Sequence, residues 1–79
     1  MDIKAKTKEV LSDLLKVKID ELKDDVALQE SIGVDSTEMV EISVGLKKEF
    51  GVPLLDNEIK KTHTLNDIVK ILKIKGVNS

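Results

Sequence analysis

DSTEMVEISVGLKKEFG, residues 35–51, is the stretch that most clearly indicates the fold of this 79-residue chain. Asp35 is suited to cap a helix, and Glu38 lies three residues later, as in a capping box. The apolar residues of one helical face follow at three- and four-residue steps, namely Met39, Ile42, Leu46 and Phe50, with Val40 and Val44 beside them. Gly51 and Pro53 are typical of a helix end. The stretch therefore predicts a helix over Ser36–Phe50.

The remaining apolar residues also recur mostly at helical spacing. The expected elements are a helix from about Ile3 to Lys16, a long connection from Val17 to Asp35 with a short helical turn near Leu28–Ser31, the helix Ser36–Phe50, a short helix capped near Asp56, a last helix capped by Thr64 and ended by Gly76, and a tail of Val77, Asn78 and Ser79. The predicted fold is all-α. It is a small up-and-down bundle of three longer helices and one short helix, in a single domain over residues 1–79.

An aliphatic core should hold these helices together, because helices of this length are marginal alone. The core is expected to contain Val10, Leu14, Ile42, Leu46, Phe50, Ile68 and Leu72. The apolar residues of the long connection are expected to pin it across the helices, since long structureless loops are uncommon in a compact domain. Its acidic residues are expected to form a solvated face, namely Asp20, Glu21, Asp24 and Asp25.

Composition excludes several classes of function. The chain has 13 Lys but no Arg, one His, no Cys and a formal charge of -2. Without Cys, and with a single His, we expect no metal site and no catalytic residue. A slightly acidic chain with one aromatic residue is a poor nucleic-acid binder. No apolar run reaches the roughly 18 residues of a membrane span, and the first residues lack the apolar core of a signal peptide. We therefore expect a cytoplasmic protein. A chain of 79 residues leaves no room for a deep substrate pocket with its own catalytic set, so we expect that it is not an enzyme. We also expect a monomer.

The residues at the start of the predicted helix Ser36–Phe50 are the candidates for a functional site. Gly33-Val34-Asp35-Ser36 places an exposed hydroxyl at a helix N-terminus, where the helix dipole and free N–H groups favour a phosphate. Taken alone, Asp35 and Glu38 are more often only a helix cap. With the whole chain considered, this segment resembles the acyl carrier protein family. In that family a Gly-x-Asp-Ser segment opens the second helix, and the Ser carries a 4′-phosphopantetheine arm.

The resemblance spans nearly the whole chain and implies a function. Ser36 would be the attachment site of an arm donated by coenzyme A, and Asp35 would orient the hydroxyl or help to hold a metal ion in the transferase. The implied role is a freestanding carrier of acyl thioesters in fatty-acid, lipid or related biosynthesis. Its partners would be a phosphopantetheinyl transferase and acyl-transferring or acyl-modifying enzymes. The residues implied to contact them are Thr37, Glu38, Met39, Glu41, Lys47 and Lys48.

The chain departs from the family's pattern where partners are expected to bind. Thr37 replaces the usual leucine, and Lys47 and Lys48 stand where the family tends to be acidic. A solvated helix C-terminus explains the two lysines equally well, because cations suit that end of the dipole. These changes predict a specialised carrier. Two alternatives stay open: an aminoacyl or peptidyl carrier of the D-alanyl or nonribosomal type, and a helical protein–protein interaction module without an arm.

Overall fold

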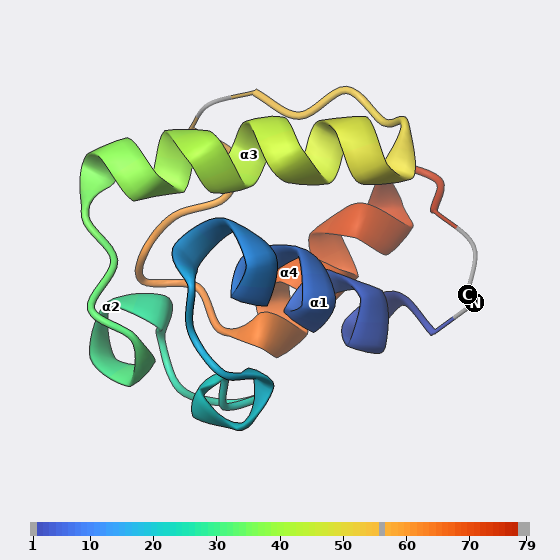
Figure 1. The fold of residues 1–79 in the computed structure, drawn as a ribbon. Coiled ribbons are helices and arrows are strands. Elements are labelled where there is room, and N and C mark those ends of the chain that lie inside the picture. Colours follow the sequence, from blue (N-terminus) through green and yellow to red (C-terminus); the bar gives the residue numbers. More distant parts are fainter. Residues whose placement is uncertain (1, 56, 78–79) are drawn as a thin grey trace.

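The computed structural model describes residues 2–55 and 57–77, and these residues contain helices and no strand. The elements are α1 (Ile3–Leu15), the 3-10 helix η1 (Ile19–Glu21), α2 (Leu28–Ser31), α3 (Ser36–Phe50) and α4 (Leu65–Ile74). Helix α1 packs against both α3 and α4, and α3 lies across one side of the molecule (Figure 1). The predicted all-α bundle with three longer helices is confirmed. No helix within the described ranges has the length and apolar character needed to cross a membrane.

The two ends of α3 lie where the sequence predicts them. Asp35 Oδ1 accepts a hydrogen bond from the Glu38 backbone N–H at 2.8 Å, and Glu38 Oε1 accepts one from the Asp35 N–H at 3.1 Å. At the other end Gly51 has a φ of 65°, a left-handed conformation that glycine adopts without a steric penalty. The capping box and the terminal glycine therefore set both boundaries of α3.

The prediction of a short helix near Asp56 is wrong for the neighbouring residues that the structure describes. Asp56 itself lies outside the described residues, and residues 57–59 form a turn. The Glu58 N–H donates to the Leu55 carbonyl at 3.1 Å, and the Glu58 carboxylate accepts from the Leu55 N–H at 2.8 Å. These two bonds close a turn and do not continue into a helix. The short helix of the bundle is α2, where the sequence predicts a helical turn.

The hydrophobic core is aliphatic, and five of its seven predicted members are buried: Val10, Ile42, Leu46, Ile68 and Leu72. Phe50 is only half-buried, and Leu14 is 36% exposed, so these two predictions need correction. Leu14 packs over Gly45 between α1 and α3. The contact is so close that a Cβ added to Gly45 would stand only 2.6 Å from Leu14 Cδ1. The long connection contributes Leu22, Leu28 and Val34 to the core, as expected of apolar residues that pin it, although Ile19 is 50% exposed. The later connection adds Leu54 and Ile59.

Two ion pairs fasten the long connection to α1. The Asp24 carboxylate lies 3.2 Å from Lys4 Nζ and 2.7 Å from Lys8 Nζ. The Asp24 carbonyl also accepts a hydrogen bond from the Asn66 N–H at 3.0 Å, at the start of α4. Asp24 is therefore not part of the solvated acidic face that the sequence predicts. Its partners lie 16 and 20 residues away along the chain, which is why local sequence does not reveal the pairing.

Removing the Asp24 charge is expected to change how stability depends on pH. Hydrogen bonds from Lys8 and Lys4 lower the pKa of the Asp24 carboxyl below its ordinary value. A carboxyl whose pKa is lowered by folding stabilises the fold above its unfolded pKa, and this contribution disappears as the pH falls through the folded pKa. Asp24→Asn should therefore lower the Tm at pH 7, and the difference from wild type should shrink below about pH 4.

Thermal unfolding followed by circular dichroism from pH 3 to pH 7 measures this effect. Asp25→Asn is the matched control, because Asp25 is exposed and forms no ion pair with the described residues. A Tm difference for Asp24→Asn that stays constant across the pH range would show that the ion pairs do not stabilise the connection.

Candidate functional site

Two buried side chains hold the segment that leads into α3. Leu28 is fully buried, and Val34 is 6% exposed. Between them Gly33 has a φ of 66°, and its N–H donates to the Leu28 carbonyl at 3.2 Å, which ends α2 and redirects the chain. The Leu28 N–H in turn donates to the His63 carbonyl at 3.0 Å, in the segment before α4. Ser36 therefore follows a segment that the core holds in place.

Ser36 occupies the first position of α3, and its side chain is exposed. The first N–H groups of a helix have no acceptor within the helix, and the positive end of the helix dipole lies there too. One of these groups, the N–H of Glu38, is satisfied by Asp35. Among the residues that the structure describes, no acceptor is found for the earlier ones, the N–H groups of Ser36 and Thr37. A phosphodiester on the Ser36 hydroxyl would thus lie at an electrostatically favourable position.

The hydroxyl groups of the described residues differ in their accessibility. The Oγ atoms of Ser31 and Ser43 are buried, and the hydroxyl of Thr64 caps α4. Thr37 is exposed, like Ser36. Among the three hydroxyl residues of α3, Ser36 and Thr37 are thus the two that a modifying enzyme can reach.

The Asp35 side chain is exposed directly beside Ser36, and one of its oxygens is engaged. Oδ1 accepts the capping hydrogen bond from the Glu38 N–H. The second oxygen, Oδ2, takes no part in the cap. Capping and assistance to a reaction at Ser36 are therefore compatible roles for this one carboxylate.

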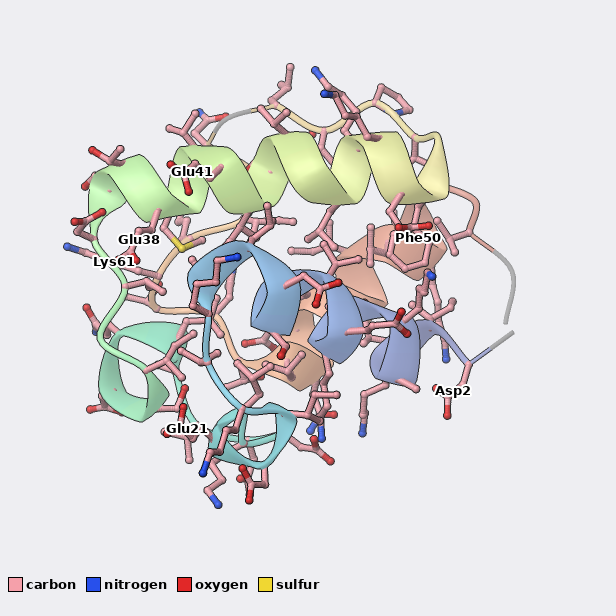
Figure 2. All side chains as sticks on the ribbon, in the orientation of Figure 1. Asp2, Glu21, Glu38, Glu41, Phe50 and Lys61 are labelled. Carbon is pink, nitrogen blue, oxygen red and sulfur yellow. The ribbon has the colours of Figure 1, made fainter. Side chains whose placement is uncertain are left out.

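The residues predicted to bind partners lie in different environments. Glu38 and Glu41 lie toward the end of α3 that begins with Ser36, and Phe50 lies at the opposite end (Figure 2). Glu38 is half-buried and takes part in the cap. Met39 is only 6% exposed, so it lies in the core and offers no surface to a partner, which corrects its assignment. The others are exposed along α3, namely Thr37, Glu41, Lys47 and Lys48.

The structure adds two valines to the exposed surface of α3. Val40 is 44% exposed and Val44 is 38% exposed, although the sequence pattern places both beside the apolar face of the helix. Each follows a buried residue, Met39 or Ser43, by one position. One position rotates a side chain about 100° around a helix, away from the core. This rotation is the signal in the sequence that could have identified them.

Comparison with known proteins shows which proteins the chain resembles. Residues 5–72 match the protein family described as a phosphopantetheine attachment site, and this range includes Ser36. The chain is also similar to an acyl carrier protein from Petrotoga mobilis, with 34% identity over 70 residues that cover 89% of this chain and 82% of that protein. No solved structure shows a significant match to the chain.

Proposed function

Because the chain belongs to the acyl carrier protein family, we propose that Ser36 bears the family's covalent 4′-phosphopantetheine and that the chain holds an acyl intermediate as a thioester on this arm. Members of this family are carriers and not catalysts, so the chain needs to supply only one reactive hydroxyl. We propose that this carrier acts in the cytoplasm. Its pathway would be fatty-acid, lipid or related biosynthesis.

The observation that carries the proposal is the exposure of Ser36 at the first position of a capped 15-residue helix. Attachment would form a bond between Ser36 Oγ, which loses its proton, and the phosphorus of the phosphopantetheine part of coenzyme A. The pyrophosphate bond of coenzyme A would break in the same step, and adenosine 3′,5′-bisphosphate would leave. The free N–H groups at the start of α3 favour the negative charge of the phosphodiester that results. When bound, the arm supplies the thiol that this chain lacks, since the sequence contains no Cys.

Attachment can be measured directly on the purified protein. The protein is incubated with coenzyme A, Mg²⁺ and a promiscuous phosphopantetheinyl transferase, and its intact mass is recorded. We expect the mass to increase by one arm per chain. Because the chain has no Cys, a thiol reagent reports the arm alone and should find one thiol per protein. A folded protein that gains neither mass nor thiol would rule the proposal out.

Two substitutions of Asp35 separate its capping role from its proposed role in attachment. Asp35→Ala removes the cap and should cost about 1 kcal/mol of stability. Asp35→Asn should keep that stability, because Asn caps helices as well as Asp does. If the carboxylate orients Ser36 or helps to hold the metal ion of the transferase, both variants should accept the arm more slowly than wild type. An Asn variant that is modified at the wild-type rate would restrict Asp35 to capping.

A further inference from the structure

The exposed side of α3 changes its chemistry from one end to the other. Successive residues on this side are Thr37, Val40, Glu41, Val44, Lys47 and Lys48, which we call the α3 face; all six are exposed. Thr37 lies next to Ser36, the acidic Glu41 lies between the two valines in the first half of the helix, and two lysines lie in the last turn. With an arm on Ser36, the phosphodiester would add a further negative charge to the acidic end.

These residues form one continuous surface. Glu41, Val44 and Lys48 are separated by three and four positions, which places them in one row along a helix. Val40 and Lys47 stand seven positions apart in the neighbouring row. At 1.5 Å per residue, Glu41 and Lys48 lie about 10 Å apart along the helix axis. The α3 face therefore changes from acidic to basic over a short distance, so that one docked partner can contact both charges.

The charges of the α3 face are not neutralised within the part of the chain that the structure describes. Glu49, which follows the two lysines, pairs with Lys6 of α1 at 3.6 Å. No ion pair among the described residues involves Glu41, Lys47 or Lys48. The opposite charges at the two ends of this face are therefore available to a partner.

We propose that the α3 face docks a protein partner whose charges run in the opposite order. Such a partner presents a cationic side chain to Glu41, an apolar side chain to Val40 and Val44, and carboxylates to Lys47 and Lys48. The inference rests on the proposed function, because the partner has to approach α3 to reach an arm on Ser36. A partner that is basic throughout would bring like charges against the two lysines, and such contacts reject wrong partners.

An acyltransferase with a uniformly basic docking surface serves as the probe. In a second version of this enzyme, two acidic residues replace the two basic residues that meet the last turn of α3. Each version is assayed with three arm-loaded carriers: the wild type, Lys47→Glu/Lys48→Glu, and the control Lys70→Glu/Lys73→Glu. The control changes two exposed lysines of α4 and has the same net charge as the first variant.

We expect the wild type and the control to prefer the acidic version of the probe by about tenfold in kcat/KM, which corresponds to about 1.4 kcal/mol. Lys47→Glu/Lys48→Glu should prefer the uniformly basic version. The preference of the wild type should weaken at high salt, because the contacts are exposed. Adding Val40→Thr and Val44→Thr should lower the activity with both versions.

Two results would overturn the inference. One is a wild type that uses both enzyme versions equally, and the other is a wild type that neither version accepts. The intact mass and the thiol count of each carrier are recorded before the assay, so that the presence of the arm is known for every carrier. A carrier that bears its arm but shows no charge preference refutes only the docking inference, whereas a carrier that never acquires an arm refutes the proposed function.

Discussion

Ser36→Ala is expected to abolish attachment of the arm completely while leaving the fold intact. The Ser36 side chain is exposed, and the capping box uses the side chains of Asp35 and Glu38. Exposed substitutions away from such features usually change stability by less than about 0.5 kcal/mol. The Ala variant should therefore keep the wild-type Tm, but its thiol count after incubation with the transferase should fall from one per chain to zero.

Thr37→Ala is the matched control for this experiment, because Thr37 carries the neighbouring exposed hydroxyl of α3. This variant should be modified as fully as the wild type. An equal mass gain on Ser36→Ala would place the arm on another residue. The alternative function as an interaction module makes a different prediction: Ser36→Ala would then retain full function in the native host.

Leu46→Ala is expected to destabilise the protein more than any surface substitution. Leu46 is fully buried in α3, and removing a buried leucine side chain costs about 2–5 kcal/mol because a cavity remains. A chain of this length has a total stability of roughly 4–12 kcal/mol. A single substitution should therefore remove a large part of the stability that holds α3 and its site in place.

Urea unfolding gives the measurement, with midpoints compared at equal slopes. Val44→Ala is the control on the same helix, since Val44 is 38% exposed and should lose less than about 1 kcal/mol. If Leu46→Ala and Val44→Ala lowered the midpoint equally, the packing described for α3 would be incorrect.

Some features of the fold follow from neighbouring residues, and these are predictable from the sequence. The start of α3 depends on Asp35 and Glu38, three residues apart, and its end depends on Gly51. In each of these signals, the residues involved lie within one or two helical turns of one another. The candidate attachment site shares this property, because Ser36 directly follows the cap. The boundaries of α3 and the position of Ser36 could therefore be predicted without a structure.

Other features depend on residues that are distant in the sequence, and these could not be predicted. Leu14 packs over Gly45, 31 positions later, and is 36% exposed, so its helical spacing alone does not reveal its environment. Asp24 is held by lysines of α1, so its place in an acidic stretch is misleading. Where the sequence predicts a short helix near Asp56, the chain instead forms a turn, in which the Glu58 carboxylate accepts a hydrogen bond from the Leu55 N–H. In each case a tertiary or side-chain contact decided the outcome.

The intact mass of the protein purified from its native host, with fragmentation to locate any modification, tests whether the chain works as a carrier. We predict one 4′-phosphopantetheine on Ser36, with part of the population bearing a cargo that hydroxylamine releases from the thioester. The mass of that cargo would distinguish an acyl carrier from an aminoacyl or peptidyl carrier. A chain that remains unmodified throughout growth, or one modified at a residue other than Ser36, would contradict the assignment.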